Sequence, residues 1–164
     1  MIAPQHRIYA CFFFFAVTTG ALMARLPDIQ TQLGVSEGQL GLTMIGMAIG
    51  SLIALTVGSP LIERLGFRTT AFITTLGPPV LFALIPWLPS APAMFAILFI
   101  VGLLAGALEI NLNVEIDRLE LQSGKRYMNR AHGFWSVGFF FTALLGALTR
   151  QSGLSAGLHM GIVA

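Results

Sequence analysis

Long apolar runs alternate with short polar segments along the chain, at a spacing typical of a membrane protein. About 20 residues at 1.5 Å each cross the hydrocarbon core of a bilayer. Five runs reach or approach that length, and a sixth stops at Ala164, about half a span short. The pattern predicts an all-α, polytopic membrane helical bundle with five complete helices and a truncated sixth. The expected spans are residues 8–24, 40–62, 69–88, 93–116 and 131–149, followed by the incomplete 154–164.

The first span has two interpretations, because Arg7 precedes an apolar stretch as it would in a signal peptide. No good small-x-small cleavage site follows, and further spans come after it. We therefore expect a mature helix, which Arg25, Pro27 and Asp28 close. A polar loop is expected from there to Gln39.

The fourth span ends in polar residues and is the most informative stretch of the chain. Four of them, Glu109, Asn111, Asn113 and Glu115, alternate with apolar residues after an uninterrupted apolar run. If the helix ends near Ile116, Glu109 lies roughly 10 Å inside that end, where a carboxylate costs about 3 kcal/mol unless it faces protein or water. Glu109 and Asn113 share one helix face. Glu109 either lines a transport pathway or extends to water at the helix end.

Two spans carry small residues at intervals of four, which lets another helix backbone approach closely. We interpret these stripes as packing surfaces and assign them no chemistry. They consist of Gly46, Gly50, Ala54 and Gly58 in the second span, and Gly138, Thr142 and Gly146 in the fifth.

Composition supports an integral membrane protein, with 55% hydrophobic and 10% charged residues, whereas soluble domains carry about 25% charged residues. The net charge of +2 does not suggest a nucleic acid partner. Cys11 is the only cysteine, and His6, His132 and His159 are scattered without metal-ligand spacing. No nucleophile elbow or phosphate-binding loop is present. We expect no enzyme activity, no cofactor and no metal.

Basic residues predict the orientation of the chain in the membrane. With the N-terminus in the cytoplasm, seven basic residues lie inside and two outside, as expected for a protein of the inner or plasma membrane. The inner set is Arg7, Arg64, Arg68, Arg118, Lys125, Arg126 and Arg130, and the outer set is Arg25 and Arg150.

A shift of 87 positions superposes several features of the two halves of the chain. Three spans per unit reverse the direction of the chain, so the two units are inverted repeats. Inverted three-helix repeats are a recurring architecture of secondary transporters, with the ligand site at the repeat interface. The matched pairs are Gly46 with Gly133, Ser59 with Gly146, Leu61 with Leu148 and Gly66 with Gly153.

The loop after the second span reads GSPLIERLGFRTT. It resembles the signature loop of the major facilitator superfamily, a Gly-x-x-x-Asp-Arg-x-Gly pattern followed by basic residues. The resemblance implies that the acid and the arginine lock the cytoplasmic side by meeting helices of the other half of the transporter. Arg64, Gly66 and Arg68 match, Glu63 replaces the aspartate, Ser59 stands at the first glycine and Phe67 replaces a basic residue.

The segments ALEINLNVE and RYMNRAHGFWSVG resemble helices 4 and 5 of fucose-permease-like sugar/proton symporters and a related bacterial branch. Glu109 and Asn113 match a glutamate and an asparagine that this family uses for proton coupling and substrate binding. Asn129 and the run from His132 resemble the start of helix 5. The family's aspartate in helix 1 has no clean counterpart, since Asp28 lies one position away.

We therefore interpret residues 1–164 as the N-terminal half of a secondary transporter that works by alternating access. As a hypothesis, Glu109 binds and releases a proton while Asn113 hydrogen-bonds a small polar solute, for which the resemblance favours a sugar. Arg25 either supplies a counter-charge, holds an anionic substrate or sits at the interface to fix topology. His132 either joins a proton relay or makes a hydrogen bond at the helix start.

The chain is too short for a whole transporter of twelve helices. Twelve helices of about 20 residues need about 240 residues before loops are counted, and the chain has 164. The expected partners are the bilayer, a solute, protons, and a missing C-terminal half or a second copy of the chain. The competing class is a non-transporting membrane scaffold or an inactive transporter fragment. An intramembrane enzyme is a distant third.

Overall fold

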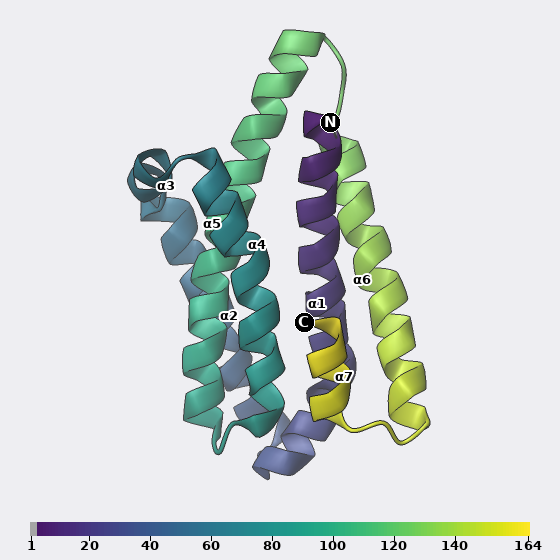
Figure 1. The fold of residues 1–164 in the computed structure, drawn as a ribbon. Helices are drawn as coiled ribbons and strands as arrows, with labels where there is room; N and C mark the ends of the chain where they lie inside the picture. Colours follow the sequence, from purple (N-terminus) through teal and green to yellow (C-terminus); the bar gives the residue numbers. More distant parts are fainter. Residues whose placement is uncertain (1–2) are drawn as a thin grey trace.

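The computed structural model describes residues 3–164, in which helices are the regular structure and no strand occurs (Figure 1). Five helical segments are long and apolar enough to cross a membrane: Pro4–Leu33, Glu37–Val57, Phe67–Trp87, Ala91–Ser123 and Met128–Gln151. The all-α prediction is confirmed. The elements are α1 (Pro4–Leu33), α2 (Glu37–Val57), α3 (Ser59–Leu65), α4 (Phe67–Leu84), the 3-10 helix η1 (Ile85–Trp87), α5 (Ala91–Ser123), α6 (Met128–Gln151) and α7 (Ala156–Val163).

Consecutive long helices run in opposite directions, so the connections gather at two ends of the bundle (Figure 1). The start of α1, the short helix α3 and the connection from α5 to α6 lie at one end, which we call the N-terminal end. The connections that follow α1, η1 and α6 lie at the opposite end, which we call the distal end. The orientation predicted from basic residues would place the N-terminal end in the cytoplasm.

Helix α1 is longer than the sequence predicted. It continues through Pro27 to Leu33, so the polar loop expected from Arg25 to Gln39 is wrong over most of its length. The extension has a packing reason, since Ile29 is fully buried in the core and Leu33 packs against the same cluster. Burial of these apolar side chains stabilises the last turns more than the missing N–H of proline weakens them.

Helix α5 is also longer, because it ends at Ser123 and not near Ile116. Ile116 is buried and Leu119 packs beside it against α1, which holds this part of the chain helical. At 1.5 Å per residue the helix is about 50 Å long, more than the hydrocarbon core of about 30 Å. Its last turns therefore extend past the start of α1, as Figure 1 shows.

The predicted second span and the loop after it are divided differently in the structure. Helix α2 ends at Val57, and Ser59–Leu65 forms the separate short helix α3 with Pro60 in its first turn. Proline suits a first turn, because the first N–H groups of a helix have no partner within it. Glu63 and Arg64 are therefore helical, where the sequence predicted a loop.

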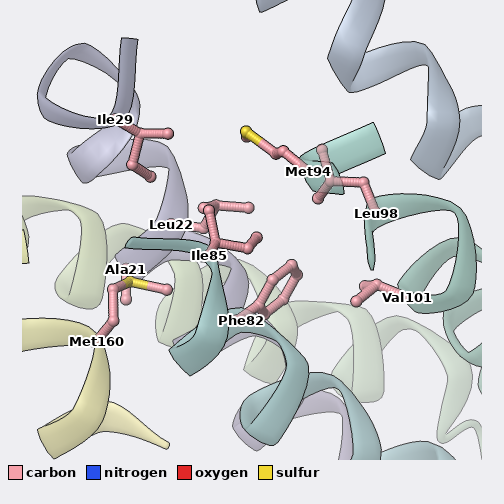
Figure 2. Packing of buried hydrophobic residues seen from close by; sticks show 9 residues of the cluster. All are labelled: Ala21, Leu22, Ile29, Phe82, Ile85, Met94, Leu98, Val101 and Met160. Atoms are coloured by element: carbon pink, nitrogen blue, oxygen red, sulfur yellow. The ribbon is translucent and has the colours of Figure 1, made fainter. Parts of the chain in front are cut away.

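Two apolar clusters form the core. One lies around Ile8, Phe12 and Leu112 toward the N-terminal end. The other lies toward the distal end and brings α1, α4, η1, α5 and α7 together, so the short last helix is part of the core (Figure 2). Its buried members are Ala21, Leu22, Ile29, Phe82, Ile85, Met94, Leu98, Val101 and Met160.

Helices α2 and α5 approach each other through small residues. A Cβ added at Gly50 would fall on the carbonyl oxygen of Phe99, and one added at Gly106 would lie 2.6 Å from the carbonyl oxygen of Ser51. The stripe predicted for the second span is confirmed at its three buried positions. It does not extend to Gly58, which follows the end of α2.

Helices α1 and α6 repeat this contact. A Cβ at Gly138 would lie 2.9 Å from the carbonyl oxygen of Phe13, and one at Gly20 would lie 2.7 Å from that of Phe139. The stripe predicted for the fifth span, Gly138, Thr142 and Gly146, is buried throughout. Both predicted stripes are thus helix-packing surfaces, as small residues in membrane helices often are.

The glycine contacts recur every four residues and therefore fit more than one register of the internal repeat. The register nearest the predicted shift pairs Gly20 with Gly106, a shift of 86, and Gly50 with Gly138, a shift of 88. The predicted shift of 87 holds at the turns, where Gly66 and Gly153 have φ of 77° and 81°. It is one residue off within these helices, so the predicted match of Gly46 with Gly133 is wrong: Gly46 is packed on Phe95, while a Cβ at Gly133 would meet open space.

Candidate functional site

A cavity of about 340 Å³ opens between α1, α2, α5 and α6. The glycine contacts described above pair α2 with α5 and α1 with α6. The cavity has the size of a small-molecule site, for which about 300–1,000 Å³ is typical. It is lined by Phe12, Phe15, Met47, Ser51, Ala105, Leu108, Glu109, His132 and Trp135.

Glu109 is the one carboxylate among the residues that line this cavity. It projects from the middle of α5, and the helix continues for 14 residues beyond it to Ser123, about 21 Å at 1.5 Å per residue. The prediction that the helix ends near Ile116 was wrong, so Glu109 does not lie at a helix end. Its side chain is exposed and lines the cavity.

His132 lines the same cavity from α6. Its ring lies against Phe12 of α1, with 5.1 Å between ring centroids. A second predicted role was a hydrogen bond at the helix start. The carboxylate of Glu120 instead accepts the backbone N–H groups of Tyr127 and Met128 there, the latter at 2.8 Å. The sequence had indicated no role for Glu120.

Asn113 lies one turn beyond Glu109 on α5 and is half-buried. Its Oδ1 atom is buried and has no hydrogen-bond partner within the described residues. A buried acceptor without a donor is costly, so a solute or water bound beside it would be stabilised. Asn113 does not itself line the cavity with Glu109.

Asn129 is exposed in the first turn of α6 and is not part of the cavity. The structure therefore brings Glu109 and His132 together but leaves Asn129 outside their cavity.

Arg25 is almost completely buried, at 1% exposure. It donates from Nε to Nδ1 of His159 at 3.1 Å, from Nη1 to Asp28 at 3.0 Å and to the Leu154 carbonyl at 2.9 Å, and from Nη2 to Thr149 at 3.1 Å. Four of its five N–H donors are thus used within the chain. Arg25 joins α1 to α6 and α7 and is a counter-charge to Asp28, outside the cavity that Glu109 lines. The substrate-holding role stays a prediction.

From sequence, Asn111 was only one of the four polar residues near the end of the fourth span. In the structure it is buried at 4% exposure, and its Nδ2 donates to the carbonyl oxygen of Phe67 at 3.1 Å. The contact links α5 to the first residue of α4. No spacing signal identifies it, because the two residues are 44 positions apart.

The signature-like loop lies at the N-terminal end of the bundle. Glu63, Arg64 and Arg68 are exposed, and the ion pairs found within residues 3–164 do not include them. Gly66 connects α3 to α4 with φ 77° and ψ 159°. This conformation is essentially restricted to glycine, which explains the residue type at this position of the motif.

Replacing Gly66 with alanine is expected to destabilise the chain by about 2 kcal/mol, because a Cβ strains a backbone of this conformation. The thermal unfolding midpoint in detergent, followed by circular dichroism, measures the effect. Gly133→Ala is the matched control: Gly133 is helical, and a Cβ there would meet open space. Equal midpoints for the two variants would contradict the conformational explanation.

Fold and cavity together define a class, an all-α polytopic membrane protein with an inverted repeat and a cavity that contains a carboxylate. A model of the Major Facilitator Superfamily matches residues 8–158, most of the chain. The chain therefore belongs to the Major Facilitator Superfamily. The two relatives described next are named as transporters.

Two curated relatives agree with this family. An uncharacterized transporter of Sinorhizobium fredii is 24% identical over 147 residues, which are 90% of this chain and 38% of the relative. An uncharacterized MFS-type transporter of Yersinia pestis is 28% identical over 164 residues, covering 98% of this chain and 40% of the relative. The chain thus spans about two fifths of the length of these relatives. No solved structure matches the chain.

Proposed function

We propose that the chain forms part of a secondary active transporter that works by alternating access, with Glu109 as its proton-binding group. The observation that carries the proposal is the position of Glu109, a carboxylate in the middle of a membrane helix that lines a cavity. An ionisable residue inside a membrane bundle is retained at a cost in insertion energy, and such residues mark ion and proton pathways.

The cavity suits a proton-coupled step, because most of its wall is apolar. Phe12, Phe15, Leu108 and Trp135 line the cavity beside the exposed Glu109, and their side chains do not neutralise a carboxylate. The net charge of the cavity therefore changes when Glu109 binds a proton. A change in net charge can alter the relative stability of the states open to each side of the membrane. His132 is the second titratable group of the lining and would relay the proton.

The lining also bears on the solute. It holds no lysine or arginine, so an anionic solute would meet Glu109 without a counter-charge. Ser51, His132 and the Trp135 indole N–H offer hydrogen-bonding groups, and the aromatic rings offer apolar faces. We propose symport of a proton with a small, polar, uncharged solute, for which the resemblance to the fucose-permease-like branch favours a sugar.

The proposal predicts a charge preference in uptake. In proteoliposomes with an inward proton gradient, a neutral monosaccharide such as radiolabelled fucose is expected to enter at least about tenfold faster than gluconate or another sugar acid of similar size, because of the repulsion from Glu109. The difference should disappear when the gradient is collapsed with a protonophore.

Controls separate this function from its alternative. Liposomes without protein give the background leak for each solute. A membrane scaffold or an inactive transporter fragment would give background uptake of every solute, with and without a gradient. Preferred uptake of the sugar acid would contradict the proposed neutral solute while leaving the transporter class intact.

A further inference from the structure

A groove of about 430 Å³ lies between α1 and α6 and shares no lining residue with the cavity of the candidate site. We call it the aromatic groove, because Phe13, Phe14 and Phe134 line it. Of its lining residues, only His6 and Tyr9 carry polar atoms in their side chains. Phe14 and Phe134 are 58% and 47% exposed, although both belong to membrane helices. The groove is therefore open at the surface of the bundle.

The aromatic groove follows the direction of the membrane helices. Helices α1 and α6 pack side by side, start at the same end of the bundle and run in the same direction (Figure 1). The lining residues lie within the first three turns of each helix, at positions 6–14 of α1 and 134–137 of α6. Three turns are roughly 15 Å, about half of the hydrocarbon core. The groove thus matches the depth of one leaflet, at the N-terminal end.

Basic residues stand at the mouth of the aromatic groove on both helices. Arg130 precedes Phe134 by four positions and Arg7 precedes Phe14 by seven, so each arginine lies on the groove face of its own helix. Both arginines are exposed. Arg130 takes part in none of the ion pairs found within residues 3–164. Positive charge therefore lies where the groove meets the membrane surface.

The hydroxyl of Tyr9 is a second polar feature of the groove. Tyr9 is buried at 6% exposure, its ring stacks on Phe134 with 5.1 Å between centroids, and its hydroxyl has no hydrogen-bond partner within the described residues. The charges of Arg130 and Glu120 act on this hydroxyl. Glu120 already accepts two backbone N–H groups at the start of α6. A buried hydroxyl without a partner is costly, so an acceptor bound beside it would be stabilised.

We infer that the aromatic groove binds an anionic phospholipid of the leaflet at the N-terminal end. One acyl chain lies along the rings of Phe14 and Phe134, which offer it apolar surface. The phosphate lies at the mouth of the groove, where Arg7 and Arg130 complement its charge. Basic residues at the cytoplasmic surface of a membrane attract anionic lipids in this way. A zwitterionic phospholipid has the same chains but no net charge, so it fits the groove without the same attraction.

A second groove provides an internal comparison. It measures about 640 Å³ and lies between the first turns of α2 and α5, at the distal end. Leu42 and Phe95 are among its lining residues, and none of the lining residues is charged. We expect this second groove to accept phospholipids without regard to their charge.

Quenching of tryptophan fluorescence by brominated lipids tests the inference without any solute, so its outcome is independent of transport. Trp87→Phe and Trp135→Phe remove the two tryptophans of the chain. One exposed reporter is then added at a time, Phe14→Trp in the aromatic groove or Leu42→Trp in the second groove. The chain is reconstituted in phosphatidylcholine bilayers with a small fraction of dibrominated phosphatidylglycerol or dibrominated phosphatidylcholine. The quenching gives the association constant of each brominated lipid at each reporter.

At residue 14, phosphatidylglycerol is expected to associate at least about fivefold more strongly than phosphatidylcholine, because one basic residue at an anionic surface contributes roughly that factor. At residue 42 the two lipids should associate equally. Arg130→Gln is expected to lower the preference at residue 14 by about fivefold. Arg64→Gln is the matched control, since Arg64 is exposed at the same end, on α3, and does not line the groove. It should leave the preference unchanged.

Equal association of the two lipids at residue 14 would overturn the inference. Equal losses in Arg130→Gln and Arg64→Gln would also overturn it, because the lipid would then respond to the total charge of the N-terminal end and not to a site. Arg130→Lys keeps the charge and should keep the preference for phosphatidylglycerol. Loss of the preference in both Arg130 variants would contradict a role of this charge in lipid binding.

Discussion

Glu109→Gln is expected to reduce proton-driven uptake to background, a loss of about 100-fold or more, while leaving membrane insertion intact. Glutamine has nearly the shape of glutamate and keeps a hydrogen-bonding side chain, but it cannot bind and release a proton. Because Glu109 is the only carboxylate that lines the cavity, no neighbouring acid in the lining can replace it. Initial rates of solute uptake into proteoliposomes, with and without a proton gradient, measure the effect.

Glu115→Gln provides the matched control for this prediction. Glu115 lies on the same helix six residues further on, is half-buried, and pairs with Arg118 at 3.2 Å. It does not line the cavity, and an ion pair this close to solvent contributes little to stability. Its variant should keep uptake within about twofold of the parent chain. Normal proton-driven uptake by Glu109→Gln would exclude Glu109 as the coupling group.

Gly50→Val is expected to give the largest loss of stability. The Cβ alone would overlap the Phe99 carbonyl oxygen and would approach the Leu103 nitrogen to 2.9 Å. Both atoms belong to the α5 backbone, so rotation of a side chain cannot relieve the overlap and the two helices must separate. Overpacking of a well-packed interface costs about 1–3 kcal/mol, and a backbone overlap at a helix contact should reach or exceed the upper value.

The unfolding midpoint in a detergent titration measures this loss. Gly41→Ala is the control, because Gly41 lies exposed on the same helix and a Cβ there meets nothing within 4 Å. Alanine at an exposed helical position should leave stability unchanged or raise it by about 1 kcal/mol. A small effect of Gly50→Val would mean that α2 and α5 are not held at the distance seen in the structure.

The membrane character of the fold could be predicted from sequence because it depends on local quantities. Each apolar side chain adds its own transfer free energy, so the runs that form α1, α2, α4, α5 and α6 are visible without knowledge of their contacts. Helix ends were less predictable. Leu33 and Ser123 end their helices well beyond the expected positions, because packing of Ile29 and Ile116 extends both helices.

Partners of polar side chains could not be predicted in the same way. The sequence singled out Glu109 by its cost in a membrane, and the structure places it with His132 in one cavity. Arg25 was also a candidate site residue, yet its guanidinium is hydrogen-bonded within the protein to groups as far as 134 positions away.

By itself the sequence determined that the chain is an all-helical membrane protein with two small-residue packing surfaces and one acid of high insertion cost. These features follow from the type and spacing of residues along single helices. Only the tertiary structure decided which helices meet at those surfaces and the roles of Arg25 and Asn111. The reason is physical: hydrogen bonds and backbone overlaps act over a few ångströms, between residues that the chain separates widely.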